Sequence, residues 1–120
     1  MAGVTLVFGV SLKEDRYSNM VVKRLLQHNI STRAFGLRSG MVGTVHIDTQ
    51  LMPYTNLDTI TLYLSPERQK MYYDYLLGLK PRRIIFNPGT ENNELYNLLA
   101  QHHIKAEVAC TLVLLSTNQY

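Results

Sequence analysis

Short apolar runs alternate with longer amphipathic segments along the chain. Five runs have the β-branched and aromatic content of strands, and they cover residues 4–10, 31–35, 58–65, 83–86 and 108–115. They are mainly apolar rather than strictly alternating with polar residues. Continuous apolar strands are typical of a parallel sheet that is covered on both faces. Residues 41–57 contain only scattered apolar anchors and predict no element.

Three segments between the runs have helical spacing of apolar residues. The first has Ser18 or Asn19 as its N-cap and Asn29 as its stop. The second opens at Ser65-Pro66, with the proline in the first turn, and the third covers residues 91–103. Strands that alternate with helices predict an α/β fold, a doubly wound sheet of about five parallel strands with helices on both faces. We expect one domain over residues 1–120.

A doubly wound sheet binds its ligand beyond the carboxyl ends of the strands, where the strand order reverses. The first strand end carries small, polar and basic residues, namely Gly9, Ser11, Arg16, Tyr17, Ser18 and Asn19. A glycine lets the backbone approach a ligand, and a helix N-terminus attracts phosphate. Arg16 would add a charge-assisted contact. The same residues also have a purely structural interpretation, as a turn with an ordinary helix cap.

Arg38 follows the second strand and is flanked by Gly36 and Gly40, which suits a phosphate, although a surface loop would look the same. An NAD site would favour an acidic residue there and the fingerprint G-x-G-x-x-G after the first strand; the sequence has neither. After the third and fourth strands, Ser65-Pro66 and Asn87-Pro88-Gly89 are placed to wall an adenine or pantetheine channel. Taken singly, they are also ordinary strand-to-helix turns.

Composition sets limits on the function. The 120 residues are 46% apolar and 18% charged, with a net charge of +3, and the basic residues are spread along the chain. A nucleic-acid interface favours a denser basic stripe. No apolar stretch reaches the roughly 20 residues of a membrane span, and no signal peptide is recognisable. We therefore expect a cytoplasmic protein without nucleic-acid or membrane partners, and the sequence leaves open whether it forms a homo-oligomer.

Catalytic and metal-binding patterns are missing from the sequence. The four histidines do not have the spacing of metal ligands. Cys110 lies in an apolar run and reads as a small buried hydrophobe without a histidine partner. No serine occupies a nucleophile elbow. We expect neither a catalytic nor a metal site, so the chain is more consistent with a binding protein than with an enzyme.

The strand-end residues, taken together, resemble a known family. Gly9-x-Ser11 followed by Arg16-Tyr17-Ser18-Asn19 is similar to the opening of small stand-alone CoA-binding domain proteins, which resemble the N-terminal domain of the succinyl-CoA synthetase alpha subunit. The resemblance continues through Val42-Gly43, Ser65-Pro66-Glu67 and Ile84 to Gly89, and ends at Cys110. Gly36 departs from the family pattern, which often has a proline before the basic residue.

The resemblance implies a Rossmann-like fold with CoA lying across the strand ends. By position, Ser11 and residues 16–19 match the segment that meets the ligand's phosphates, and Arg38 matches a basic residue after the second strand. The ligase chemistry of the synthetase belongs to another domain, so the resemblance implies a CoA or acyl-CoA binding module. Two alternatives stay open, namely a binder of NAD(P) or another nucleotide, and a ligand-free interaction domain.

Overall fold

The computed structural model of the chain describes residues 3–120, so the first two residues of the predicted domain lie outside the described part. One seven-stranded sheet, in the order β3-β4-β2-β1-β5-β6-β7, organises these residues. The strands are β1 (Val4–Phe8), β2 (Thr32–Phe35), β3 (Gly40–Val42), β4 (Val45–Asp48), β5 (Leu57–Leu62), β6 (Arg83–Phe86) and β7 (Lys105–Val108). The helices are α1 (Tyr17–Gln27), α2 (Pro66–Gln69), the 3-10 turn η1 (Lys70–Tyr72), α3 (Tyr73–Leu79), α4 (Asn93–Gln101) and α5 (Thr111–Ser116).

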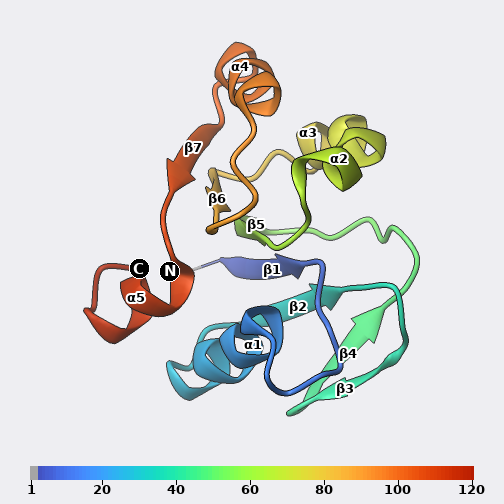
Figure 1. Cartoon of the computed structure of the whole chain (residues 1–120), viewed down its shortest axis with the longest axis vertical. Coiled ribbons are helices and arrows are strands. Elements are labelled where there is room, and N and C mark those ends of the chain that lie inside the picture. The colour runs from blue at the N-terminus through green and yellow to red at the C-terminus, as the bar shows by residue number, and fades with distance from the viewer. Residues whose placement is uncertain (1–2) are drawn as a thin grey trace.

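The sheet has helices on both faces, as predicted (Figure 1). Alternate residues of β1 point to opposite faces, so Leu6 and Phe8 pack with one cluster and Val7 with the other. The first cluster includes Leu76 from α3 and two leucines from α4, and the second includes residues of α1 and α5. Burial on both faces explains why β1, β5 and β6 are mainly apolar.

The strand order reverses at β1, which pairs in parallel with β2 on one side and with β5 on the other. The chain first builds outward through β2 to β4, and then returns to build outward through β6 to β7. This doubly wound arrangement confirms the predicted fold class. The strand count is higher than predicted, because β3 pairs antiparallel with β4 and both come from the segment that predicted no element. In β4, buried Val45 and Ile47 alternate with His46 and Asp48, a period of two that four residues make hard to recognise.

The last predicted strand is wrong. Residues 105–108 form β7, whereas residues 111–116 form α5 and Cys110 is its N-cap residue. The apolar run is a short amphipathic helix, in which Thr111 and Leu115 are buried and Val113 is exposed. A short, mainly apolar run fits a buried strand and a buried helix equally well. The true strand lies at the edge of the sheet, where charged residues such as Lys105 and Glu107 are common.

Helix boundaries differ from the predictions: the third helix, predicted over residues 91–103, is α4, Asn93–Gln101, and the first two differ more. The first helix starts at Tyr17, so Ser18 and Asn19 lie inside its first turn and Arg16 is the N-cap residue. The helix that begins at Pro66 was expected to be continuous, but it divides into α2, η1 and α3. Within residues 3–120, no helix is long and apolar enough to cross a membrane.

Candidate functional site

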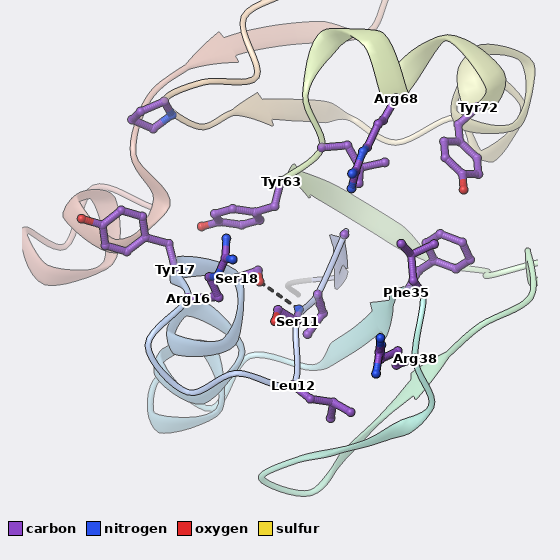
Figure 2. A pocket seen from close by; sticks show the side chains of 16 residues that line it. Ser11, Leu12, Arg16, Tyr17, Ser18, Phe35, Arg38, Tyr63, Arg68 and Tyr72 are labelled. Atoms are coloured by element: carbon purple, nitrogen blue, oxygen red, sulfur yellow. Dashed lines mark hydrogen bonds between the residues drawn. The ribbon is translucent and has the colours of Figure 1, made fainter.

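A cavity of about 490 Å³ opens at the carboxyl ends of β1, β2 and β5, where the strand order reverses. Its volume falls in the range of pockets that hold small molecules and cofactors. Seven of the twelve predicted site residues line it, namely Gly9, Ser11, Arg16, Tyr17, Ser18, Arg38 and Pro88. Figure 2 shows the side chains of Ser11, Arg16, Tyr17, Ser18 and Arg38 around the opening.

The loop after β1 is fixed to the start of α1 by hydrogen bonds. The backbone N–H of Ser11 donates to Ser18 Oγ at 3.0 Å, and Asn19 Nδ2 donates to the Ser11 carbonyl at 2.9 Å (Figure 2 shows the first). Asn19 is buried and does not line the cavity. Its conformational role is therefore to hold the loop whose other residues form the cavity wall.

The N-terminus of α1 faces this cavity through Arg16, Tyr17 and Ser18. Within the described residues no side chain caps it, and its first turn contains no acidic residue. Backbone N–H groups at an uncapped helix start, together with the positive end of the helix dipole, attract anions. This end of α1 therefore offers a phosphate a favourable position.

The loops after β1 and β2 contact each other closely. The N–H groups of Gly9 and Val10 both donate to the Phe35 carbonyl at 2.8 Å. A Cβ atom at Gly36 would overlap the Val10 carbonyl oxygen, so only glycine fits there without a backbone shift. Gly36 departs from the family pattern and is accounted for by this contact. The close contact at Gly36 also places Arg38, two residues later, at the mouth of the cavity.

The opposite wall comes from residues that follow β5 and that are not among the predicted site residues. Tyr63 and Leu64 lie just beyond the strand, and Arg68 and Tyr72 come from α2 and η1. The Tyr72 ring packs edge-on against Phe8 at 5.1 Å and Phe35 at 5.7 Å between ring centres. Burial raises the pKa of Tyr63 above its ordinary value, at which the hydroxyl is already protonated at neutral pH.

Nine lining residues were not predicted, namely Val10, Leu12, Phe35, Gly36, Leu37, Tyr63, Leu64, Arg68 and Tyr72. Most are apolar and carry no chemical signal of their own. Arg68 and Tyr72 are the exception, because they are four residues apart just after the start of a predicted helix. Such spacing puts two side chains on one side of a helix, so both were within reach of sequence reasoning.

Four predicted residues outside the cavity lining belong to the turns behind it. Asn87 is buried and joins three elements: its Nδ2 donates to Thr61 Oγ1 at 2.8 Å, and its Oδ1 accepts from the Thr111 N–H at 2.9 Å. Ser65 and Pro66 are the N-cap and first residue of α2, and Gly89 has a positive φ of 93°. The structure thus gives these four residues conformational roles.

The cavity is strongly cationic. Arg16, Arg38 and Arg68 reach it from three different elements, whereas no lining residue in the range 3–120 is an Asp or a Glu. Figure 2 shows Arg68 on one side of the opening and Arg16 and Arg38 on the other. Within that range none of the three forms an ion pair. Such a site favours a ligand with several negative charges.

The fold and the cavity define a doubly wound domain of the nucleotide-binding type. The sequence matches the family described as CoA binding domain over residues 4–116, and the chain belongs to that family. A comparison with curated proteins finds no match. Within residues 3–120, no three His, Cys, Asp or Glu side chains are grouped so that they could hold a metal ion.

Solved structures share the fold over nearly the whole chain. A crystal structure of an uncharacterised protein is 37% identical, with a TM-score of 0.96, and the match covers 100% of this chain and 99% of that one. A protein from Thermus thermophilus is 14% identical, with a TM-score of 0.87 and coverages of 99% and 91%. A hypothetical protein from Pyrococcus horikoshii OT3 is 21% identical, with a TM-score of 0.77 and coverages of 92% and 79%. The last two matches concern the fold alone.

Proposed function

We propose that the chain binds CoA or an acyl-CoA in the cavity at the carboxyl ends of β1, β2 and β5, and that it has no catalytic residues of its own. The observation that carries this proposal is the set of three arginines in a cavity whose described lining contains no carboxylate. CoA offers a matching pattern of charge, because it has a pyrophosphate and a 3′-phosphate. Membership of the CoA-binding family supports the same ligand.

The arrangement of the cavity suggests which part of the ligand each wall would contact. The uncapped start of α1, with Arg16 beside it, suits the pyrophosphate. Arg38 lies after β2, where a dinucleotide enzyme would favour an acidic residue for the ribose, and it suits the 3′-phosphate. Phe35, Leu64 and Tyr72 give the remaining wall an apolar surface for uncharged parts of the ligand.

Titration calorimetry with CoA, dephospho-CoA and NADPH tests the proposal. CoA should bind, and dephospho-CoA should bind more weakly because it lacks the 3′-phosphate that Arg38 meets. CoA should also raise the melting temperature by mass action as its concentration exceeds the dissociation constant. Lys80→Ala is the matched control, since Lys80 follows α3 and does not line the cavity. It should leave the affinity unchanged.

Two outcomes would replace this proposal. Binding of NADPH without binding of millimolar CoA would reassign the cavity to another nucleotide. Failure of every ligand to bind, with a folded protein, would favour an interaction domain that holds no ligand. Co-purification offers a separate check, because native mass spectrometry of fresh protein should detect a bound mass that matches CoA or an acyl-CoA.

A further inference from the structure

Gln69 is a fully buried polar residue that lies behind the cavity and does not line it. Its Nε2 donates to two backbone carbonyls, Leu64 at 2.8 Å and Thr90 at 2.8 Å. The first carbonyl belongs to the loop after β5, and the second to the loop after β6. Gln69 is the last residue of α2 and directly follows Arg68, the arginine on the β5 side of the cavity.

Asn92 completes this cluster. Its Nδ2 donates to Gln69 Oε1 at 2.7 Å and to the Tyr73 hydroxyl at 2.9 Å, while its Oδ1 accepts from the Leu95 N–H and caps α4. Both ends of the Gln69 amide are therefore hydrogen-bonded inside the protein. A buried polar network in which every member is satisfied fixes one arrangement of the segments that it joins.

The short helix α2 needs such a support. It has four residues, and Ser65, its N-cap residue, makes no capping hydrogen bond through its side chain. One helical turn is not stable by itself, because fixing its backbone yields very few hydrogen bonds. Tyr72, in the 3-10 turn η1 that follows α2, is held by packing against Phe8 and Phe35. The amide of Gln69, the last residue of α2, ties this helical turn to the loops after β5 and β6.

We propose that Gln69 is the positioning residue for Arg68, and that through it the buried cluster sets the affinity of the cavity for the ligand's phosphate. This inference rests on the proposed function. Arg68 is exposed, and within the described residues it forms no ion pair that would direct its guanidinium. Its direction into the cavity follows from the placement of α2 (Figure 2).

A double-mutant cycle tests the inference by measuring CoA affinity calorimetrically at a temperature where every variant is folded. Arg68→Ala should weaken binding by about tenfold or more, the loss of one charge-assisted contact. Gln69→Met keeps the length of the side chain but removes its hydrogen bonds, and should weaken binding by about three- to tenfold. When Arg68 is already alanine, Gln69→Met should change the affinity by less than about twofold, because no guanidinium is left to position.

A second variant and a control separate positioning from general destabilisation. Asn92→Asp keeps the oxygen that caps α4 but places a carboxylate oxygen in place of the donor to Gln69 Oε1, and should show the same dependence on Arg68. Thr59→Val removes a buried acceptor for Arg83 at the amino end of β5. It should lower the melting temperature and leave CoA affinity unchanged.

The possible results are distinguishable. If the unmodified protein binds CoA and the losses of affinity in the cycle are additive, the role of Gln69 is overturned and the proposed function stands. The same conclusion follows if the Arg68→Ala variant binds CoA with normal affinity. A Thr59→Val variant that weakens binding as much as Gln69→Met would also overturn the role of Gln69, since loss of stability alone would then suffice. Absence of CoA binding by the unmodified protein would remove both proposals together.

Discussion

Two groups of arginines lie at opposite ends of the parallel strands, and they differ in their partners. At the amino end of β6, Arg82 Nε contacts Asp58 Oδ1 at 2.7 Å and Arg83 Nη1 contacts Glu107 Oε1 at 3.0 Å. The Arg83 guanidinium also lies over the Tyr120 ring, 4.5 Å from its centre. Arg83 is only 5% exposed, so its charge is neutralised inside the protein.

At the carboxyl end, Arg16, Arg38 and Arg68 surround a cavity whose described lining has no carboxylate. Unpaired charges of one sign around a cavity do not stabilise the fold, because they repel one another. The same residue type therefore occurs in two settings in this sheet. Arginines at the amino end are paired within the structure, and we propose that those at the carboxyl end bind a ligand.

Replacing Arg83 should have the largest effect on stability. Arg83→Met removes the buried cation that contacts Glu107 and Thr59, leaves Glu107 with only the more distant Lys105, and should reduce the free energy of unfolding by on the order of 3 kcal/mol. Urea unfolding followed by circular dichroism measures this change. CoA affinity, determined below the unfolding transition, should stay within about twofold of normal. A loss of affinity as large as that of a cavity arginine would show that the two groups are not separate.

Replacing Arg38 should have the converse effect. Arg38→Ala should weaken CoA binding by about 10- to 100-fold, which corresponds to about 1.5–3 kcal/mol. Its effect on unfolding without ligand should be within about 0.5 kcal/mol, since Arg38 is exposed and forms no ion pair in the described part of the chain. Calorimetry and urea unfolding of the same preparation give both values. Normal affinity for CoA would contradict the role of Arg38.

The Asp58–Arg82 pair should make a smaller, pH-dependent contribution to stability. The hydrogen bonds from Arg82 hold the pKa of Asp58 below its ordinary value, against the opposing effect of burial. A carboxyl whose pKa is lowered by folding stabilises the protein above its unfolded pKa, and this contribution is lost as the pH falls through the folded pKa. Because the pair is partly exposed, Asp58→Asn should cost up to about 1 kcal/mol at pH 7.

Urea unfolding of both proteins from pH 7 down to about pH 3 checks this sign. The difference between Asp58→Asn and the unmodified protein should shrink as the pH falls, because Asp58 becomes neutral in the unmodified protein and then resembles the neutral amide of the variant. CoA affinity at pH 7 should not differ between them. A difference that grows on acidification would contradict the assignment of Asp58.

Cys110→Ser should have the smallest effect of these substitutions, because the proposed function includes no catalytic residue whose loss could change acetyl-CoA hydrolysis. Cys110 is the N-cap residue of α5 and is partly exposed. The purified protein should not hydrolyse acetyl-CoA above the spontaneous rate, measured by release of free thiol, and the variant should behave in the same way. Turnover that Cys110→Ser abolishes would make this residue a nucleophile and the protein an enzyme.

The sequence was sufficient to predict the fold class and some of the residues that line the cavity. Apolar strands such as β1 and β6 and the turns after them follow from periodicity and from the positions of Gly9 and Pro88. Arg16 and Arg38 could be predicted because charged residues at strand ends are conspicuous. The edge strands were harder, since Lys105 and Glu107 give β7 the composition of a loop.

The rest of the site depends on tertiary contacts that leave no local pattern. Gln69 has no feature in the sequence that marks it as buried, and its hydrogen-bond partners Leu64 and Thr90 become neighbours only when β5 and β6 pair. In the same way, Asn87 resembles a turn residue until the structure shows its bonds to β5 and α5. Sequence patterns indicate which residues lie at strand ends, whereas packing decides which of them face the cavity.

A crystal structure of the protein with CoA would test the central claim most directly. We expect ligand density in the cavity at the carboxyl ends of β1, β2 and β5, with phosphate oxygens within hydrogen-bond distance of the Arg38 guanidinium and of the backbone N–H groups at the start of α1. Density for CoA elsewhere on the molecule, or in this cavity with its phosphates directed away from all three arginines, would contradict it.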